Sequence, residues 1–187
     1  MGDRTKISWT DSTWNPWRGC HKVGAGCKYC YMFRDQERYG NDPNVVVRSK
    51  TTFNDPLKWK VGRKIFPRSW SDWFIEEADE WRAEAWEIIK ATPRHTYQIC
   101  TKRIERAAEC LPADWGAGYP NVWLGVTGEN QEMFDSRAKI LLGIPAARRW
   151  ISVEPMLEAI NPYPMECNYI PPSWGDSGVD WVVIGGE

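Results

Sequence analysis

Three cysteines lie within eleven positions near the start of the chain, at Cys20, Cys27 and Cys30. Three glycines lie beside or between them, so the segment is flexible enough to wrap around one metal centre. A structural zinc site is closed by four protein ligands, whereas a 4Fe–4S cluster held by three cysteines leaves one iron open to a cofactor or substrate. The C-x6-C-x2-C spacing therefore favours an iron–sulfur cluster with one open position.

Two other interpretations of these thiols stay open. His21 beside Cys20 could complete a Cys3His zinc site, although adjacent residues seldom ligate one ion without strain. The fourth zinc ligand could instead be one of the distant cysteines, Cys100, Cys110 or Cys167. The thiols could also be unrelated core residues, since free cysteine is often buried.

The composition is that of an ordinary soluble globular protein. The chain has 187 residues, which suit one domain over residues 1–187, with 42% apolar and 26% charged residues. The formal net charge of -1 argues against the broad basic surface of a non-specific nucleic-acid coat. No apolar run is long enough for a membrane helix, and Met1 to Thr10 lacks an apolar leader core. Crowded cysteines in such a chain indicate a metal in a reducing compartment, so we expect a cytoplasmic protein with no membrane partner.

Tryptophan is unusually frequent, with 13 residues. We expect most of these side chains to fill the core, since an indole buries a large area. The alternative is that some are exposed and stack on a base or an adenine ring.

Short apolar runs alternate with helical stretches after Asn44, which is typical of βα units and a parallel sheet. The first strand is predicted within Trp14–Arg18, and the later ones are Val45–Val47, Tyr97–Cys100, Val122–Val126, Trp150–Val153 and Trp181–Ile184. This count predicts an α/β fold, namely a partial (βα)6 TIM-like barrel whose last helix is missing. A doubly wound open sheet fits the alternation equally well.

Helices are predicted between these runs. Ser71 is expected to cap a helix with an apolar face from Phe74 to Ile89, which stops at Pro93. Further helices are expected over Tyr29–Tyr39, Ile104–Leu111 and Gln131–Leu142, while Glu158–Gly178 is expected to be a long loop. His95, at the start of a strand, is interpreted as a surface histidine.

Polar residues and glycines follow the predicted strands. In TIM-like barrels the residues just beyond the carboxyl ends of the strands face the active site. By that rule one mouth is formed by Thr101, Lys102, Arg103, Thr127, Glu129, Asn130, Glu154, Gly185, Gly186 and Glu187. The alternatives are a solvated first helical turn for Lys102 and Arg103 and a simple turn for the glycine pair.

The cysteine segment resembles that of the radical S-adenosylmethionine (SAM) superfamily, whose usual loop is C-x3-C-x2-C after the first strand of a partial TIM-like barrel. Tyr29 occupies the place of the aromatic residue that precedes the last cysteine. More closely, the chain resembles a phage and prophage family of three-cysteine proteins of undefined activity, with a distant likeness to spore photoproduct lyase-type enzymes. The shared segments are Ile7–Thr10, Trp14–Trp17, Cys27–Tyr31, Thr101–Arg103, Val122–Thr127, Ile151–Pro155 and Ile184–Glu187.

Two departures accompany this resemblance. The first cysteine gap is six residues rather than three. Members of the phage family usually continue well past the Gly-Gly-Glu sequence, so we expect a truncated or split member that lacks the barrel's last cover.

The resemblance implies a 4Fe–4S cluster on Cys20, Cys27 and Cys30, with SAM chelating the open iron. One electron from the cluster would cleave SAM to methionine and a 5′-deoxyadenosyl radical, which abstracts a substrate hydrogen. The implied cofactor-binding residues are Tyr29, Lys102, Arg103, Thr127, Glu129, Asn130, Glu154, Gly185, Gly186 and Glu187, with Glu154 and Lys102 also catalytic candidates. Lys102 and Arg103 would bind the SAM carboxylate or a substrate phosphate, and Glu187 would accept from the SAM ammonium group.

The implied partners are a flavodoxin- or ferredoxin-type reductant protein and a substrate that is a nucleic-acid base or modified nucleotide, in the bacterial host cytoplasm if the protein is phage-encoded. One alternative is a catalytically inactive, truncated phage protein that serves as a metal-stapled binding module for a host or phage protein. Another is a zinc-binding nucleic-acid module, against which the near-neutral charge argues.

Overall fold

The structure is a computed structural model of the chain, and it describes residues 4–162 and 178–185. Its main sheet has six parallel strands in the order β1-β4-β5-β6-β7-β8. They are β1 (Ser12–Trp14), β4 (Lys64–Pro67), β5 (Thr96–Thr101), β6 (Val122–Thr127), β7 (Arg148–Val153) and β8 (Trp181–Ile184). Each strand of this sheet lies beside the one that precedes it in the chain, and the α/β class with a parallel sheet is confirmed.

The last four strands agree with the sequence prediction. Strands β5 and β6 are the most buried, and they are rich in the aromatic and β-branched residues that suit a sheet covered on both faces. Register is fixed by residue pairs such as Ile99 beside Leu124 and Val126 beside Ile151. The carboxyl ends of all these strands therefore lie at one edge of the sheet.

The first two strands differ from the prediction. Val47–Arg48 (β3) does not join the main sheet but pairs antiparallel with Trp17–Arg18 (β2) in a separate two-stranded sheet. The place beside β1 is taken by β4, which the sequence does not predict because its four residues begin with an exposed lysine and end in a proline. The single strand expected over Trp14–Arg18 is divided between β1 and β2.

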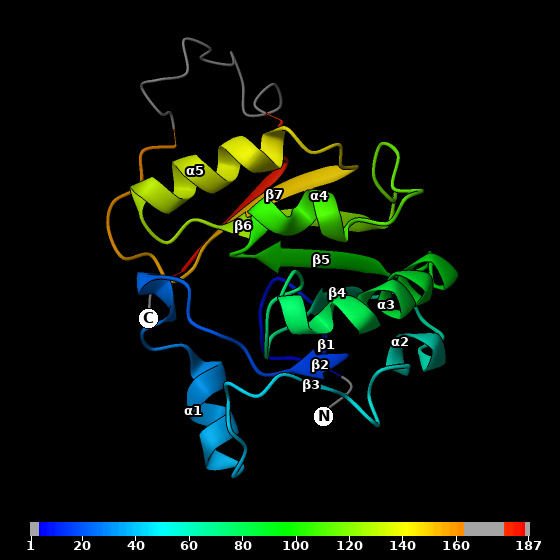
Figure 1. Cartoon of the computed structure of the whole chain (residues 1–187). Coiled ribbons are helices and arrows are strands. Elements are labelled where there is room, and N and C mark those ends of the chain that lie inside the picture. The colour runs from blue at the N-terminus through cyan, green and yellow to red at the C-terminus, as the bar shows by residue number, and fades with distance from the viewer. Residues whose placement is uncertain (1–3, 163–177, 186–187) are drawn as a thin grey trace.

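Five helices connect the strands: α1 (Tyr31–Arg38), α2 (Asp55–Lys58), α3 (Asp79–Ala91), α4 (Ala107–Cys110) and α5 (Gln131–Leu142). Single 3-10 turns precede three of them, at η1 (Ala25–Cys27), η2 (Glu76–Ala78) and η3 (Ile104–Arg106). In Figure 1, α3 and α4 lie in front of the sheet, α5 lies along its upper part, and α1 projects away from it. No helix in the described part of the chain has the length and apolar character needed to span a bilayer.

The helix ends show one agreement and one correction. Asn130 caps α5, since its side-chain oxygen accepts from the Met133 amide at 2.9 Å. Ser71 does not cap α3, which begins eight residues later at Asp79; its hydroxyl instead donates to the Gly19 carbonyl. The apolar face of α3 is nevertheless as expected, with Ala85, Ile88 and Ile89 buried.

Tryptophans supply much of the core. Six are buried, namely Trp14, Trp17, Trp73, Trp86, Trp115 and Trp150, while Trp59 and Trp81 pack partly exposed against them. Four more stay half-buried, namely Trp9, Trp70, Trp123 and Trp181, and Trp174 lies outside the described residues. Buried tryptophans thus fill the core, and the half-buried ones are exposed enough to stack on a planar ring.

His95 is not a surface residue as expected. Its side chain is 1% exposed, and its Nε2 lies 3.1 Å from the carbonyl oxygen of Pro56. Burial lowers the pKa of this imidazole, and the nearby Arg94 and Arg63 charges lower it further. The sequence does not reveal this burial because it depends on the α2 segment, which is distant in sequence.

Candidate functional site

The cysteine segment lies at the carboxyl edge of the main sheet, on the side toward which β5 points (Figure 1). The Cys20 amide donates to Pro43 at 2.8 Å, and the Gly19 amide donates to Trp70, beyond the end of β4, at 3.0 Å. Gly19 has φ +91, and a Cβ there would lie 2.3 Å from the Val45 carbonyl oxygen. Glycine is therefore required where the chain enters this segment.

Glu129 supports the middle of the cysteine segment from below. It is fully buried, and a Cβ added to Gly26 would lie 2.9 Å from its Cγ, while one added to Gly24 would lie 3.3 Å from its Oε1. Arg137 on α5 donates to the other carboxylate oxygen at 2.6 Å and to the Thr127 carbonyl at 2.6 Å. Glu129 thus lies beyond the carboxyl end of β6, where it packs against Gly24 and Gly26 of the cysteine segment.

Asp72 and Arg103 form a buried polar group beside Cys20. Asp72 accepts from the Thr101 hydroxyl at 2.6 Å and the Lys102 amide at 2.9 Å, and it lies 3.5 Å from the Arg103 guanidinium. Arg103 donates to the Cys20 sulfur at 3.6 Å and to the His21 carbonyl at 2.8 Å. Burial raises the pKa of the Cys20 thiol to about 11, the negative charge of Asp72 adds to this, and Arg103 opposes it.

Arg68 is a second buried cation in this region. It follows the carboxyl end of β4, has φ 85, and is 2% exposed, with its guanidinium 4.1 Å from the centre of the Trp17 ring. None of its three side-chain nitrogens has a hydrogen-bond partner within residues 4–162 and 178–185. Burial lowers the pKa of Arg68, while the charges of Asp72 and Cys20 raise it.

Lys102 and Thr127 meet across the ends of β5 and β6. The Lys102 ammonium donates to the Thr127 hydroxyl at 3.3 Å, and the Cys100 sulfur lies 3.5 Å from the same hydroxyl. Burial raises the pKa of the Cys100 thiol to about 11. The Lys102 ammonium and the Cys100 thiol thus both lie against the Thr127 hydroxyl at the carboxyl edge of the sheet.

Glu154 and Gly185 lie together beyond β7 and β8. The Ser152 hydroxyl donates to Glu154 at 3.2 Å, and a Cβ on Gly185 would lie 2.5 Å from the Glu154 carboxylate. A side chain at position 185 would therefore displace the Glu154 carboxylate from its place against the backbone. The pKa of Tyr31 is raised by desolvation and then by nearby negative charges, among them Cys30 and Glu154.

The remaining candidates lie apart from this group or outside the described residues. Tyr29 is 72% exposed with its ring against Lys28, and the side-chain oxygen of Asn130 is engaged in the helix cap. Gly186 and Glu187 lie outside the described residues. The structure brings together Cys20, Arg103, Lys102 and Thr127 with Glu129 beneath the loop, and places Glu154 with Gly185.

The possible fourth zinc ligands occupy different surroundings. The His21 imidazole pairs with the Glu77 carboxylate. Cys110 is buried in the core on α4, where its carbonyl accepts from Trp86. Cys100 lies at the mouth, and Cys167 falls outside the described residues.

The three thiols are of the ligand type that iron–sulfur clusters use. Among residues 4–162 and 178–185, no three histidine, cysteine, aspartate or glutamate side chains are gathered closely enough to hold a metal ion. The cysteines are nevertheless free thiols at the carboxyl edge, and Cys20 has two buried arginines near it, one of which lacks any acceptor. Three thiols with arginines nearby are chemically compatible with an anionic cluster. To bind such a cluster, the segment from Cys20 to Cys30 would have to close around it.

Two residues of the site are not predicted from the sequence. Arg68 and Asp72 follow β4, which is itself not predicted, so the rule that selects residues beyond strand ends does not reach them. A signal was present in the dense run of tryptophan and charged residues from Arg68 to Trp73, which is unusual for a surface loop.

Comparison with known proteins identifies a family without an activity. Residues 4–187 match the model of one protein family, whose description is "Protein of unknown function (DUF5131)". No curated protein and no solved structure matches the chain.

Proposed function

The chain belongs to this family of unknown function, DUF5131, and we propose from its site that it is a radical SAM enzyme with a 4Fe–4S cluster on Cys20, Cys27 and Cys30. The observation that carries the proposal is the buried guanidinium of Arg68, which has no hydrogen-bond partner among residues 4–162 and 178–185. Arg68 lies two residues before Trp70, whose carbonyl accepts from the Gly19 amide next to Cys20, and the charges of Arg68 and Cys20 act on each other. A buried cation with unsatisfied donors is costly unless a negative group accompanies it. An iron–sulfur cluster on three thiolates is such a group.

The surroundings of Cys20 support the same conclusion. Arg68 and Arg103 are two buried cations whose charges act on Cys20, whereas within residues 4–162 and 178–185 Asp72 is the one carboxylate in contact with Arg103. Hydrogen bonds and positive charge near a cluster adjust its reduction potential. We assign both arginines the role of offsetting the negative charge of the cluster.

The strand order supports a partial barrel. A doubly wound sheet reverses its strand order at a switch point, whereas the order β1-β4-β5-β6-β7-β8 runs in chain sequence throughout. We take six parallel strands with sequential crossovers as the start of a TIM-like barrel, in which the carboxyl edge carries the active site. The cysteine segment and the candidate residues share that edge.

The cluster and SAM, when bound, would supply one-electron cleavage of the sulfonium. The chain's own residues would bind and orient the amino-acid end of SAM. Lys102, held by the Thr127 hydroxyl, is placed to bind a carboxylate, and Glu154 is placed to accept from an ammonium group. Gly185 leaves room for the Glu154 carboxylate. Arg137 holds the Glu129 side chain, against which Gly24 and Gly26 of the cysteine segment pack.

Anaerobic reconstitution tests this proposal. The chain is purified without oxygen, supplied with iron and sulfide, and analysed for both elements, for its absorption spectrum and for 5′-deoxyadenosine after addition of SAM and dithionite. We expect about four irons per chain and SAM cleavage. Zinc binding without iron would contradict the proposal.

Two cysteine variants provide the matched comparison. Cys27→Ser is expected to lose the cluster, whereas Cys110→Ser, a thiol in the core on α4, is expected to keep it. Full iron loading in Cys27→Ser would refute the ligand assignment. A cluster that forms without cleaving SAM would favour the alternative, a metal-stapled binding module.

The proposed setting follows from this chemistry. An oxygen-sensitive cluster needs a reducing compartment, so we assign the protein to a cytoplasm with a flavodoxin- or ferredoxin-type reductant. The substrate is proposed to be a nucleic-acid base or modified nucleotide. A screen of SAM cleavage with nucleoside and oligonucleotide additions would test this, since a true substrate should yield a hydrogen-abstraction product.

A further inference from the structure

A second cavity lies at the amino ends of the strands, opposite the cysteine segment. Its volume is about 430 Å³, within the range of small-molecule sites. It is lined by Ser8, Trp9, Thr10, Asp11, Lys64, Trp123, Arg148, Asp180 and Trp181. Lys64, Trp123, Arg148 and Trp181 belong to the first residues of four parallel strands, so the length of β6 puts the two edges roughly 16 Å apart.

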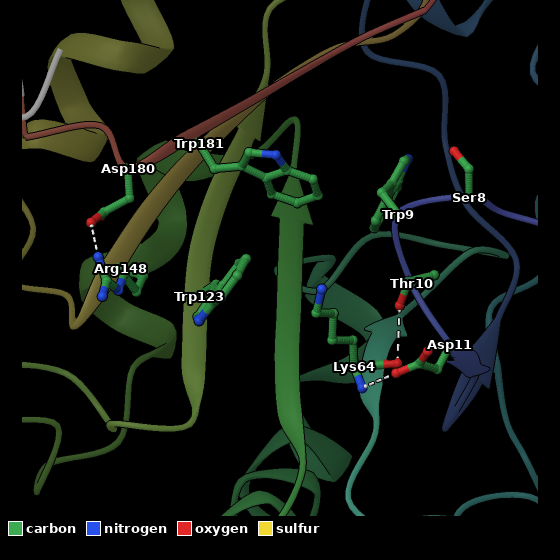
Figure 2. Close-up of a pocket in the computed structure, with 9 residues that line it drawn as sticks. All are labelled: Ser8, Trp9, Thr10, Asp11, Lys64, Trp123, Arg148, Asp180 and Trp181. Carbon is green, nitrogen blue, oxygen red and sulfur yellow. Dashed lines mark hydrogen bonds and ion pairs between the residues drawn. The ribbon is translucent and has the colours of Figure 1, made fainter.

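Three half-buried indoles form the walls of this cavity. Figure 2 shows Trp9 and Trp123 on opposite sides, with Trp181 across the top between them. The Trp181 ring centre lies 5.9 Å from that of Trp9 and 5.7 Å from that of Trp123, both in edge-to-face arrangement. Trp150 stacks against Trp181 at 5.3 Å and holds it in place from the core side. Partly exposed indoles held rigidly in this way are surfaces for a planar ring.

Lys64 supplies an unpaired positive charge to the same cavity. Its side chain points into the space between the indoles (Figure 2), and within the described part of the chain its ammonium has no hydrogen-bond or ion-pair partner. The two carboxylates of the lining are already engaged. Asp180 pairs with Arg148 at 2.6 Å, and Asp11 accepts from the Lys64 backbone amide at 2.7 Å.

We propose that this cavity binds a nucleotide, with the base against the indoles of Trp9, Trp123 and Trp181 and a phosphate on the Lys64 ammonium. An aromatic ring suits the indole walls, and an anion suits the Lys64 ammonium, which has no hydrogen-bond or ion-pair partner in the described part of the chain. The nucleotide is either free or the 5′-phosphorylated end of a single strand, since both present the same chemistry.

Calorimetric titration of the full chain with nucleoside 5′-monophosphates tests the proposal. The comparisons are the corresponding nucleosides, inorganic phosphate and a short 5′-phosphorylated oligonucleotide. We expect a nucleotide to bind more tightly than its nucleoside and than phosphate. Tighter binding of the oligonucleotide would identify a strand end, and equal binding would identify a free nucleotide. Nucleotide binding no tighter than that of phosphate would overturn the proposal.

Matched lysine variants locate the phosphate. Lys64→Gln should weaken nucleotide binding about tenfold and leave nucleoside binding unchanged, because a charge-assisted contact is lost. Lys60→Gln removes the same charge from an exposed position outside the cavity and should bind like the parent. Trp123→Leu should weaken nucleotide and nucleoside alike by about tenfold. Equal affinities in Lys64→Gln and Lys60→Gln would refute the site.

This inference is independent of the proposed radical chemistry. Cys27→Ser, which is expected to lack the cluster, should bind the nucleotide as the parent does. Loss of nucleotide binding in that variant, with the fold retained by circular dichroism, would show that the ligand occupies the cysteine end instead. Failure of SAM cleavage would leave the titration result unaffected.

Discussion

Replacement of Arg68 by methionine is expected to stabilise the cluster-free protein and to weaken the retention of the proposed cluster. In the cluster-free chain, the three buried side-chain nitrogens of Arg68 have no hydrogen-bond partner among the residues that the structure describes. An unsatisfied buried donor costs about 1–3 kcal/mol, so even the low end gives roughly 3 kcal/mol for this side chain. Methionine removes that cost and keeps an apolar stem against Trp17.

The gain is reduced by the contact that is lost. The guanidinium lies 4.1 Å from the centre of the Trp17 ring, and a desolvated cation–π contact is worth about 1–2 kcal/mol. The free energy of unfolding of the cluster-free protein should therefore rise by roughly 1–2 kcal/mol in Arg68→Met. For a chain of this size that corresponds to a rise in melting temperature of about 2–8 °C.

Iron loading should change in the other direction. If Arg68 offsets the charge of a cluster beside Cys20, Arg68→Met should lose iron faster than the parent when both are exposed to a chelator. Urea unfolding of the cluster-free proteins and chelator-driven iron release measure the two effects. Arg34→Met, which removes an exposed arginine on α1, should change neither.

The reasoning would be refuted by a cluster-free Arg68→Met protein that is less stable than the parent by 1 kcal/mol or more. Such a result would mean that the fold itself satisfies Arg68. Unchanged iron release would separate Arg68 from the cluster even if the stability effect were as expected.

Three further predictions concern the support of the site and the response to pH. Gly26→Ala should destabilise the protein by about 1–3 kcal/mol in thermal unfolding, because its Cβ would overlap the Glu129 side chain at 2.9 Å. Arg137→Met should cost about 3–5 kcal/mol by urea unfolding, since it leaves the buried Glu129 carboxylate without its cation, and the double variant with Glu129→Met should recover part of this loss. Burial lowers the pKa of His95 in the folded state, so the unfolded chain takes up its proton first as the pH falls below about 6.5. Stability should therefore decline from pH 7 toward pH 5 down to the folded pKa, and His95→Gln should flatten that decline in urea titrations.

The second half of the fold could be predicted because its signals are local. Strands β5 to β8 each contain a short run rich in apolar residues, and α5 carries an asparagine cap and an apolar face that can be read from the sequence. The parallel arrangement then places Lys102, Thr127 and Glu154 at one edge without further information. This is why the candidate residues after β5, β6 and β7 share the carboxyl edge in the structure.

The first half could not be predicted because its elements are held by contacts distant in sequence. Strand β4 is short and ends in proline, and it is recognisable only through its pairing with β1 and β5. Arg68 and Asp72 follow it and are hidden with it. The burial of Glu129 under two glycines depends on Arg137 and on the cysteine segment together, and strand-end rules give position but not depth.

The anchors of the cysteine segment also set the order in which the site can be completed during synthesis. The three cysteines leave the ribosome early. The residues that contact their segment, Trp70, Arg103 and Glu129, are synthesised up to about a hundred residues later. Domains fold as their chain emerges, so the segment has no fixed surroundings until the strands through β6 are present. Iron delivered to a nascent chain would meet loose thiols, and productive insertion belongs to a stage after most of the sheet has formed.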